Sequence, residues 1–138
     1  SQSVTLAYAD VFELDEELVK KIATSFGGGM GRLREVCGAV SGMFILLGME
    51  YPSTNPDEKS KKTENYSAVQ RTANEFKNRF GSIICADLLK IKREAQQPEA
   101  DDRNAAYYQK RPCAKLVTHA AEIVGEEIIL NRKGKNKD

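Results

Sequence analysis

Tryptophan is absent from this sequence, histidine occurs once, and aromatic residues make up 7% of the 138 residues. The charges are also nearly balanced, with 21 basic and 20 acidic side chains. Nucleic-acid-binding proteins carry a basic stripe on the folded surface, so this composition argues against a nucleic-acid partner. Four basic groups and one acid are concentrated in residues 131–138, which we expect to form a flexible basic tail.

A long apolar segment is also missing. The longest run without charge, residues 36–49, has 14 residues, whereas a membrane-spanning helix needs about 18 or more. Residues 1–10 show neither the basic stretch nor the apolar run of a secretory leader. We therefore expect no membrane segment and, since the chain does not begin with Met, a truncated N-terminus.

Only three cysteines occur, Cys37, Cys85 and Cys113, and no two of them form a C-x-x-C pair. Zinc-ribbon and thioredoxin motifs are therefore excluded. An odd number of widely spaced cysteines is unusual for a secreted protein stabilised by disulfides. We expect a cytoplasmic protein whose thiols are either buried core residues or reactive groups.

Apolar residues recur at helical spacing along most of the chain, and no segment alternates convincingly like a strand. The pattern predicts one all-α domain over residues 1–130, folded as a compact bundle of five to six helices. In the long polar helix we expect a buried stripe of Val69, Ala73, Phe76 and Phe80. The expected helices cover residues 1–11, 15–25, 33–47, 57–80, 82–89 and 112–128, with a polar loop over 92–111.

A glycine-rich segment interrupts this pattern, because adjacent glycines lose too much backbone entropy to remain helical. Its glycines can let two backbones approach closely, or their amides can bind an anion or cofactor with help from Arg32 or Arg34; the two interpretations have equal weight. We expect the segment to run close to Cys37, with a glycine at positive φ and free amides directed at the cysteines. The residues concerned are Gly27, Gly28, Gly29 and Gly31.

Cys37 falls inside the expected helix 33–47, with Gly38 and Gly42 on one face of it. Two glycines inside an apolar helix cost about 1 kcal/mol each relative to alanine. Such a cost indicates either tight packing against another helix or access of a ligand to Cys37.

Cys85 and Cys113 both fall in the first turn of an expected helix, Cys113 directly after Pro112. Free amides at a helix start favour a thiolate, and Arg111 adds positive charge beside Cys113. We therefore expect iodoacetamide to modify Cys113 well below pH about 8.5, the value of a free thiol.

Three pieces of the sequence resemble the C_GCAxxG_C_C family of redox-active proteins, which are small bacterial and archaeal proteins with four cysteines and a Cys-Gly-Ala-x-x-Gly motif. The pieces are residues 26–32 (Phe-Gly-Gly-Gly-Met-Gly-Arg), 35–42 (Glu-Val-Cys-Gly-Ala-Val-Ser-Gly) and 80–82 (Phe-Gly-Ser). The resemblance covers most of the chain. It implies that Cys37, Cys85 and Cys113 occupy the second, third and fourth cysteine positions, and that the first cysteine lies immediately before Ser1.

Two functions fit such a set of cysteines. In a thiol–disulfide oxidoreductase, Cys113 attacks a disulfide, Cys37 or Cys85 resolves the intermediate, and a redox partner protein but no cofactor is needed. Alternatively, Cys37, Cys85 and Cys113 hold zinc or an iron–sulfur cluster. A third possibility is a non-catalytic helical binding module in which the cysteines only pack. Both of the first two functions require at least two of the three sulfurs to lie close together.

Overall fold

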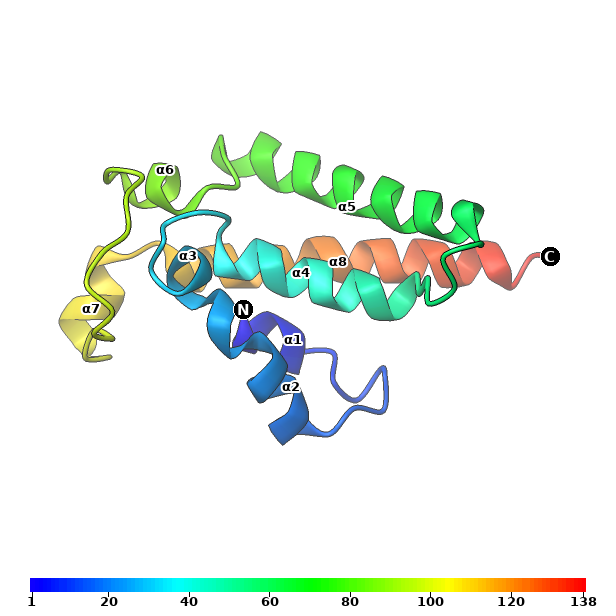
Figure 1. Ribbon diagram of the computed structural model, residues 1–138, viewed down its shortest axis with the longest axis horizontal. Helices are drawn as coiled ribbons and strands as arrows, with labels where there is room; N and C mark the ends of the chain where they lie inside the picture. Colours follow the sequence, from blue (N-terminus) through cyan, green and yellow to red (C-terminus); the bar gives the residue numbers. More distant parts are fainter.

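Helices make up 64% of the computed structural model, which describes residues 1–138 and has no strands (Figure 1). The all-α prediction is therefore confirmed, and each of the six expected helices has a counterpart. The elements are α1 (Gln2–Leu6), α2 (Glu16–Ala23), the 3-10 helix η1 (Thr24–Phe26), α3 (Gly27–Met30), α4 (Gly38–Glu50), α5 (Lys59–Phe80), α6 (Cys85–Leu89), α7 (Ala105–Lys110) and α8 (Cys113–Lys135).

The three long helices α4, α5 and α8 lie side by side and enclose the core (Figure 1). α4 is apolar on all sides, as a helix surrounded by other helices must be, and its Val40 and Met43 are fully buried. α5 is polar except for a stripe that faces the core, where Phe76 is fully buried. Along this stripe Thr72 is buried and Ala73 only half-buried, so the stripe is displaced from the expected one by one residue.

Glycines allow the N-terminal segments to lie directly against α4. A Cβ atom at Gly42 would lie 2.9 Å from the Ser1 carbonyl oxygen and 3.0 Å from the Cβ of Val4. A Cβ atom at Gly38 would lie 2.8 Å from the Phe26 carbonyl oxygen. Real side chains do not tolerate such distances, so tight packing accounts for the two glycines in this helix.

α4 begins at Gly38, so the expectation that Cys37 lies inside a helix from residue 33 is wrong. The backbone before it cannot be helical, because Met30, Arg32 and Arg34 have φ values of 68°, 67° and 62°. Residue Val36 is then extended and forms an antiparallel bridge with Ile84.

The loop expected over residues 92–111 ends early, because Ala105–Lys110 form α7. The Asn104 side chain accepts a hydrogen bond of 3.0 Å from the Tyr107 amide and so caps this short helix. The segment is polar, so the spacing of apolar residues could not predict α7.

The basic residues expected as a flexible tail begin as the last turns of α8, which continues to Lys135. Asn131 and Arg132 donate hydrogen bonds of 2.7 Å and 3.0 Å to the carboxylate of Glu50, which is buried at the end of α4. This contact ties the C-terminal half of α8 to α4. No helix has the combined length and apolar character that a membrane span requires.

Candidate functional site

Each of the three cysteines lies at the start of a different helix. Cys37 is the N-cap residue of α4, Cys85 is the first residue of α6, and Cys113 is the first residue of α8. The expected first-turn positions of Cys85 and Cys113 are therefore confirmed. The late start of α4 gives Cys37 the same kind of position, which the sequence did not indicate.

A short antiparallel contact brings Cys37 and Cys85 to the same side of the backbone. The Cys37 amide donates to the Ile83 carbonyl at 2.8 Å, and the Cys85 amide donates to the Glu35 carbonyl at 2.7 Å. These two bonds flank the bridge between Val36 and Ile84, so Cys37 and Cys85 are diagonal neighbours across it. The Cα atoms of diagonal neighbours of this kind are typically about 7–8 Å apart.

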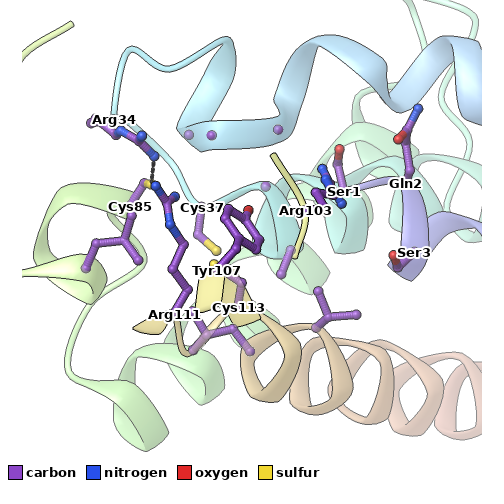
Figure 2. A pocket seen from close by; sticks show the side chains of 18 of the residues that line it. Ser1, Gln2, Ser3, Arg34, Cys37, Cys85, Arg103, Tyr107, Arg111 and Cys113 are labelled. Atoms are coloured by element: carbon purple, nitrogen blue, oxygen red, sulfur yellow. Dashed lines mark hydrogen bonds between the residues drawn. The ribbon is translucent and has the colours of Figure 1, made fainter. Parts of the chain in front are cut away.

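The three cysteines line one cavity of about 200 Å³ at the end of the bundle where α4 and α8 begin. Figure 2 shows Cys85 beside Arg34, with Cys37 and Cys113 grouped near Tyr107 and Arg111. All three free thiols therefore face a common space instead of being enclosed in separate apolar pockets. Ser1 lines the same cavity, and the further cysteine that the resemblance implies stays a prediction.

The glycine segment forms part of the cavity wall through Gly27, Gly28 and Gly29. Gly28, Gly29 and Gly31 have positive φ, as expected. A Cβ atom at Gly29 would lie only 2.5 Å from the Cβ of Cys85, so the segment runs against Cys85 as well as near Cys37. Close approach of two backbones is thus one reason for these glycines, and the binding of an anion to their amides stays a prediction.

Gly31 and Arg32 are not part of the cavity lining. Arg32 instead forms an ion pair of 3.1 Å with Asp101 in the long loop. Of the two arginines that the sequence offered as anion-binding residues, Arg34 is the one that lines the cavity.

Burial dominates the titration of two of the thiols. It raises the pKa of Cys37, although the amides of Ala39 and Val40 at the start of α4 act to lower it. Burial also raises the pKa of Cys113, and the nearby Arg111 opposes this shift only in part. The expectation that Cys113 titrates below a free thiol is therefore wrong, because removal of water outweighs the helix start and the guanidinium.

Arg34 is a buried charged side chain that contacts one of the cysteines, and only 1% of its surface is exposed. Its Nε and Nη2 atoms donate to the Gln96 Oε1 atom at 3.0 Å and 2.6 Å. Its Nη1 atom donates to the Cys85 sulfur at 3.5 Å. Gln96 comes from the loop after α6, so its contact with Arg34 could not be seen in the sequence.

Arg103, Tyr107 and Arg111 also line the cavity, and sequence analysis assigned no site role to Arg103 or Tyr107. The guanidinium carbons of Arg103 and Arg111 lie 6.0 Å and 4.9 Å from the centroid of the Tyr107 ring. These are cation–π distances, so α7 and its flanks hold both guanidinium groups at the cavity.

The side chains do not fit a zinc or iron–sulfur site. No three His, Cys, Asp or Glu residues are grouped so that they could hold a metal ion. His119, the only histidine, is outside the cavity lining and lies against Phe80, with a ring-centroid distance of 5.2 Å. Residues 1–138 therefore do not group the ligands that a tetrahedral thiolate site requires.

The fold and the site define a class of protein: a helical protein with three thiols around one cationic cavity. Comparison with protein families identifies the family, because the family model described as "Putative redox-active protein (C_GCAxxG_C_C)" matches residues 1–127. The chain belongs to this family, and the resemblance seen in its sequence is confirmed. Neither a curated protein nor a solved structure matches the chain.

Proposed function

We propose that the protein is a thiol–disulfide oxidoreductase that reacts with disulfides at the cysteine cavity. The observation that carries this proposal is the convergence of three free thiols, from helix starts far apart in sequence, on one cavity of about 200 Å³. Exchange requires an attacking thiol that a substrate can reach and a second thiol nearby.

Cys113 is our choice for the attacking thiol. It is half-buried, whereas Cys37 and Cys85 are each 8% exposed, so a substrate disulfide reaches Cys113 most easily. The Cys113 thiolate forms a bond to one sulfur of the substrate, the substrate S–S bond breaks, and the other sulfur leaves as a thiolate with the bonding electron pair. Burial raises the pKa of Cys113, and the guanidinium of Arg111 opposes this rise in part.

Cys85 is our choice for the resolving thiol. It lines the cavity from the start of α6, and Arg34 donates a hydrogen bond of 3.5 Å to its sulfur. A guanidinium at that distance stabilises negative charge on the sulfur. Attack of the Cys85 thiolate on the Cys113 sulfur releases the second substrate thiolate and leaves a Cys85–Cys113 disulfide. The protein thereby loses two electrons, the substrate gains them, and the protons of the two cysteines pass to the released thiolates.

A cytoplasmic redox partner, a protein with a dithiol, would reduce the Cys85–Cys113 disulfide and complete the cycle. The metal-binding alternative has no grouping of ligands in its favour.

The test uses the reduced full chain and bis(2-hydroxyethyl) disulfide, a small neutral substrate, followed by intact-mass and peptide analysis. We expect a Cys85–Cys113 disulfide in the unmodified protein and a stable mixed disulfide on Cys113 in Cys85→Ser. Cys113→Ser should lose the fast reaction, whereas Cys37→Ser, the matched control, should keep it. Equal rates in the three variants, or a mixed disulfide that forms first on Cys37, would contradict these assignments.

A further inference from the structure

The cavity is lined by positive charge without compensating acids. Three guanidinium groups, those of Arg34, Arg103 and Arg111, are among its lining residues, and no Asp or Glu is. Asp101 is a carboxylate beside the lining residues, and it binds Arg111 at 2.7 Å and Arg32 at 3.1 Å. Of the four guanidinium groups at or beside the cavity, two share the Asp101 carboxylate, and those of Arg34 and Arg103 form no ion pair.

Arg34 has the most unusual environment of the four. It is 1% exposed and has no carboxylate within ion-pair distance; its partners are the neutral Gln96 amide and the Cys85 sulfur. A buried cation costs much free energy unless negative charge lies near it. The lining of the cavity therefore favours any occupant that brings negative charge close to Arg34.

Arg103 is the guanidinium most available to such an occupant. Its side chain forms no ion pair and is held only by the Tyr107 ring, at 6.0 Å. A planar guanidinium binds a carboxylate through two parallel hydrogen bonds, which a thiol or hydroxyl group cannot match.

From these observations we infer that the substrate of this cavity is a small disulfide that carries carboxylate groups. The inference rests on the proposed exchange at Cys113, and it names the substrate class that the arginines select. Arg103 acts as a specificity-determining residue, because it contacts the charged part of the substrate and not the reacting sulfurs.

Three disulfides of similar size and different charge test this selection: dithiodiglycolate, with two negative charges, the neutral bis(2-hydroxyethyl) disulfide, and cystamine, with two positive charges. We expect the exchange rate to fall in that order, and the preference for dithiodiglycolate over cystamine to shrink as salt is added. Arg103→Gln should reduce this preference about fivefold, the factor expected for one nearby charge. The exposed Arg71, which pairs with Glu127 outside the cavity, provides the control Arg71→Gln, for which we expect no change.

A second readout does not depend on disulfide exchange. Iodoacetate and iodoacetamide both alkylate thiols, and only the first is negatively charged. We expect the rate of iodoacetate divided by the rate of iodoacetamide at Cys113 to fall about fivefold in Arg103→Gln and to stay constant in Arg71→Gln. A ratio that is unaffected by Arg103→Gln, or a preference for cystamine, would overturn the inference even if exchange occurs. A charge-dependent ratio without exchange of any disulfide would instead refute the proposed function and leave the anion preference supported.

Discussion

Gly29→Ala is a direct test of the contact between the glycine segment and Cys85. Gly29 has a φ of +67°, and a Cβ atom there would lie 2.5 Å from the Cβ of Cys85 and 3.0 Å from the Cα of Arg34. Gly31 has a similar φ of +61°, but its Cβ atom would approach only the Ser25 carbonyl oxygen, at 3.9 Å. Alanine would therefore meet a similar backbone strain at both positions, and the two positions differ in the atoms that surround the added Cβ atom.

The expected loss of stability follows from this difference. Gly31→Ala should lower the free energy of unfolding by about 1 kcal/mol, the cost of placing a Cβ atom in the left-handed region. Gly29→Ala adds an overpacking cost of about 1–3 kcal/mol, because the obstructing atoms are a Cβ atom and backbone that cannot rotate away. The total for Gly29→Ala is then about 2–4 kcal/mol.

Urea unfolding of the reduced proteins, followed by far-ultraviolet circular dichroism, measures both values. A gap of about 1 kcal/mol or more between Gly29→Ala and Gly31→Ala is expected, with equal denaturant slopes. In the folded state, Gly29→Ala should also expose Cys85 to iodoacetamide faster than Gly31→Ala does. Equal stabilities for the two variants would refute the argument that Cys85 and the glycine segment are in contact.

Two further predictions concern buried ionisable groups. The raised pKa values of Cys37 and Cys113 mean that these thiols ionise at a lower pH in the unfolded protein than in the folded protein. Their contribution to stability is therefore complete below pH about 8.5, and it is lost as the pH rises through their folded-state pKa values. Urea unfolding between about pH 7 and 9.5 should show a decline of at most about 1.4 kcal/mol per pH unit for each thiol, smaller in Cys37→Ser, and a flat profile would contradict thiol burial. Glu50→Ala should lower the free energy of unfolding by about 1–3 kcal/mol, because it leaves Arg132 without the buried carboxylate. The exposed Glu75, changed to alanine as a control, should cost less than about 0.5 kcal/mol, and equal losses would show that burial of Glu50 adds nothing.

The long helices were predictable because each buries a single stripe or is apolar all round. Leu116, Ala120, Ile123, Val124 and Ile128 recur at helical spacing, and all five are buried along α8. Such spacing depends only on the local sequence, so it survives without knowledge of the neighbouring helices.

The position of Cys37 could not be predicted in the same way. The apolar run that starts at Val36 favours a helix, but Arg32 and Arg34 just before it have left-handed φ values that non-glycine residues rarely adopt. Those values are held by contacts with distant segments, including the bridge from Val36 to Ile84. A long-range backbone pairing therefore decides where α4 begins.

The arginine lining was hidden for a related reason. The sequence offered Arg32 and Arg34 equally, and only the structure shows that Arg34 is buried, with its guanidinium hydrogen-bonded to Gln96 and Cys85. Arg103 and Tyr107 lie in and beside α7, whose polar residues give no apolar repeat. Membership of a cavity is a property of tertiary structure, and the sequence indicated the cysteines, the glycine segment and one of two arginines, but neither Arg103 nor Tyr107.

The direction of the long helices explains why the thiols meet. The chain runs outward along α4 and back along α5, so α6 begins at the end where α4 began (Figure 1). The loop and α7 stay at that end, and α8 then runs outward again, parallel to α4 (Figure 1). The starts of α4 and α8 bring free amides to the cavity, which favours thiolates. The same convergence excludes water, which favours thiols, and the raised pKa values of Cys37 and Cys113 show that this second effect is larger. Because the thiolate is the form that oxidants attack, the raised pKa values should slow the oxidation of both cysteines.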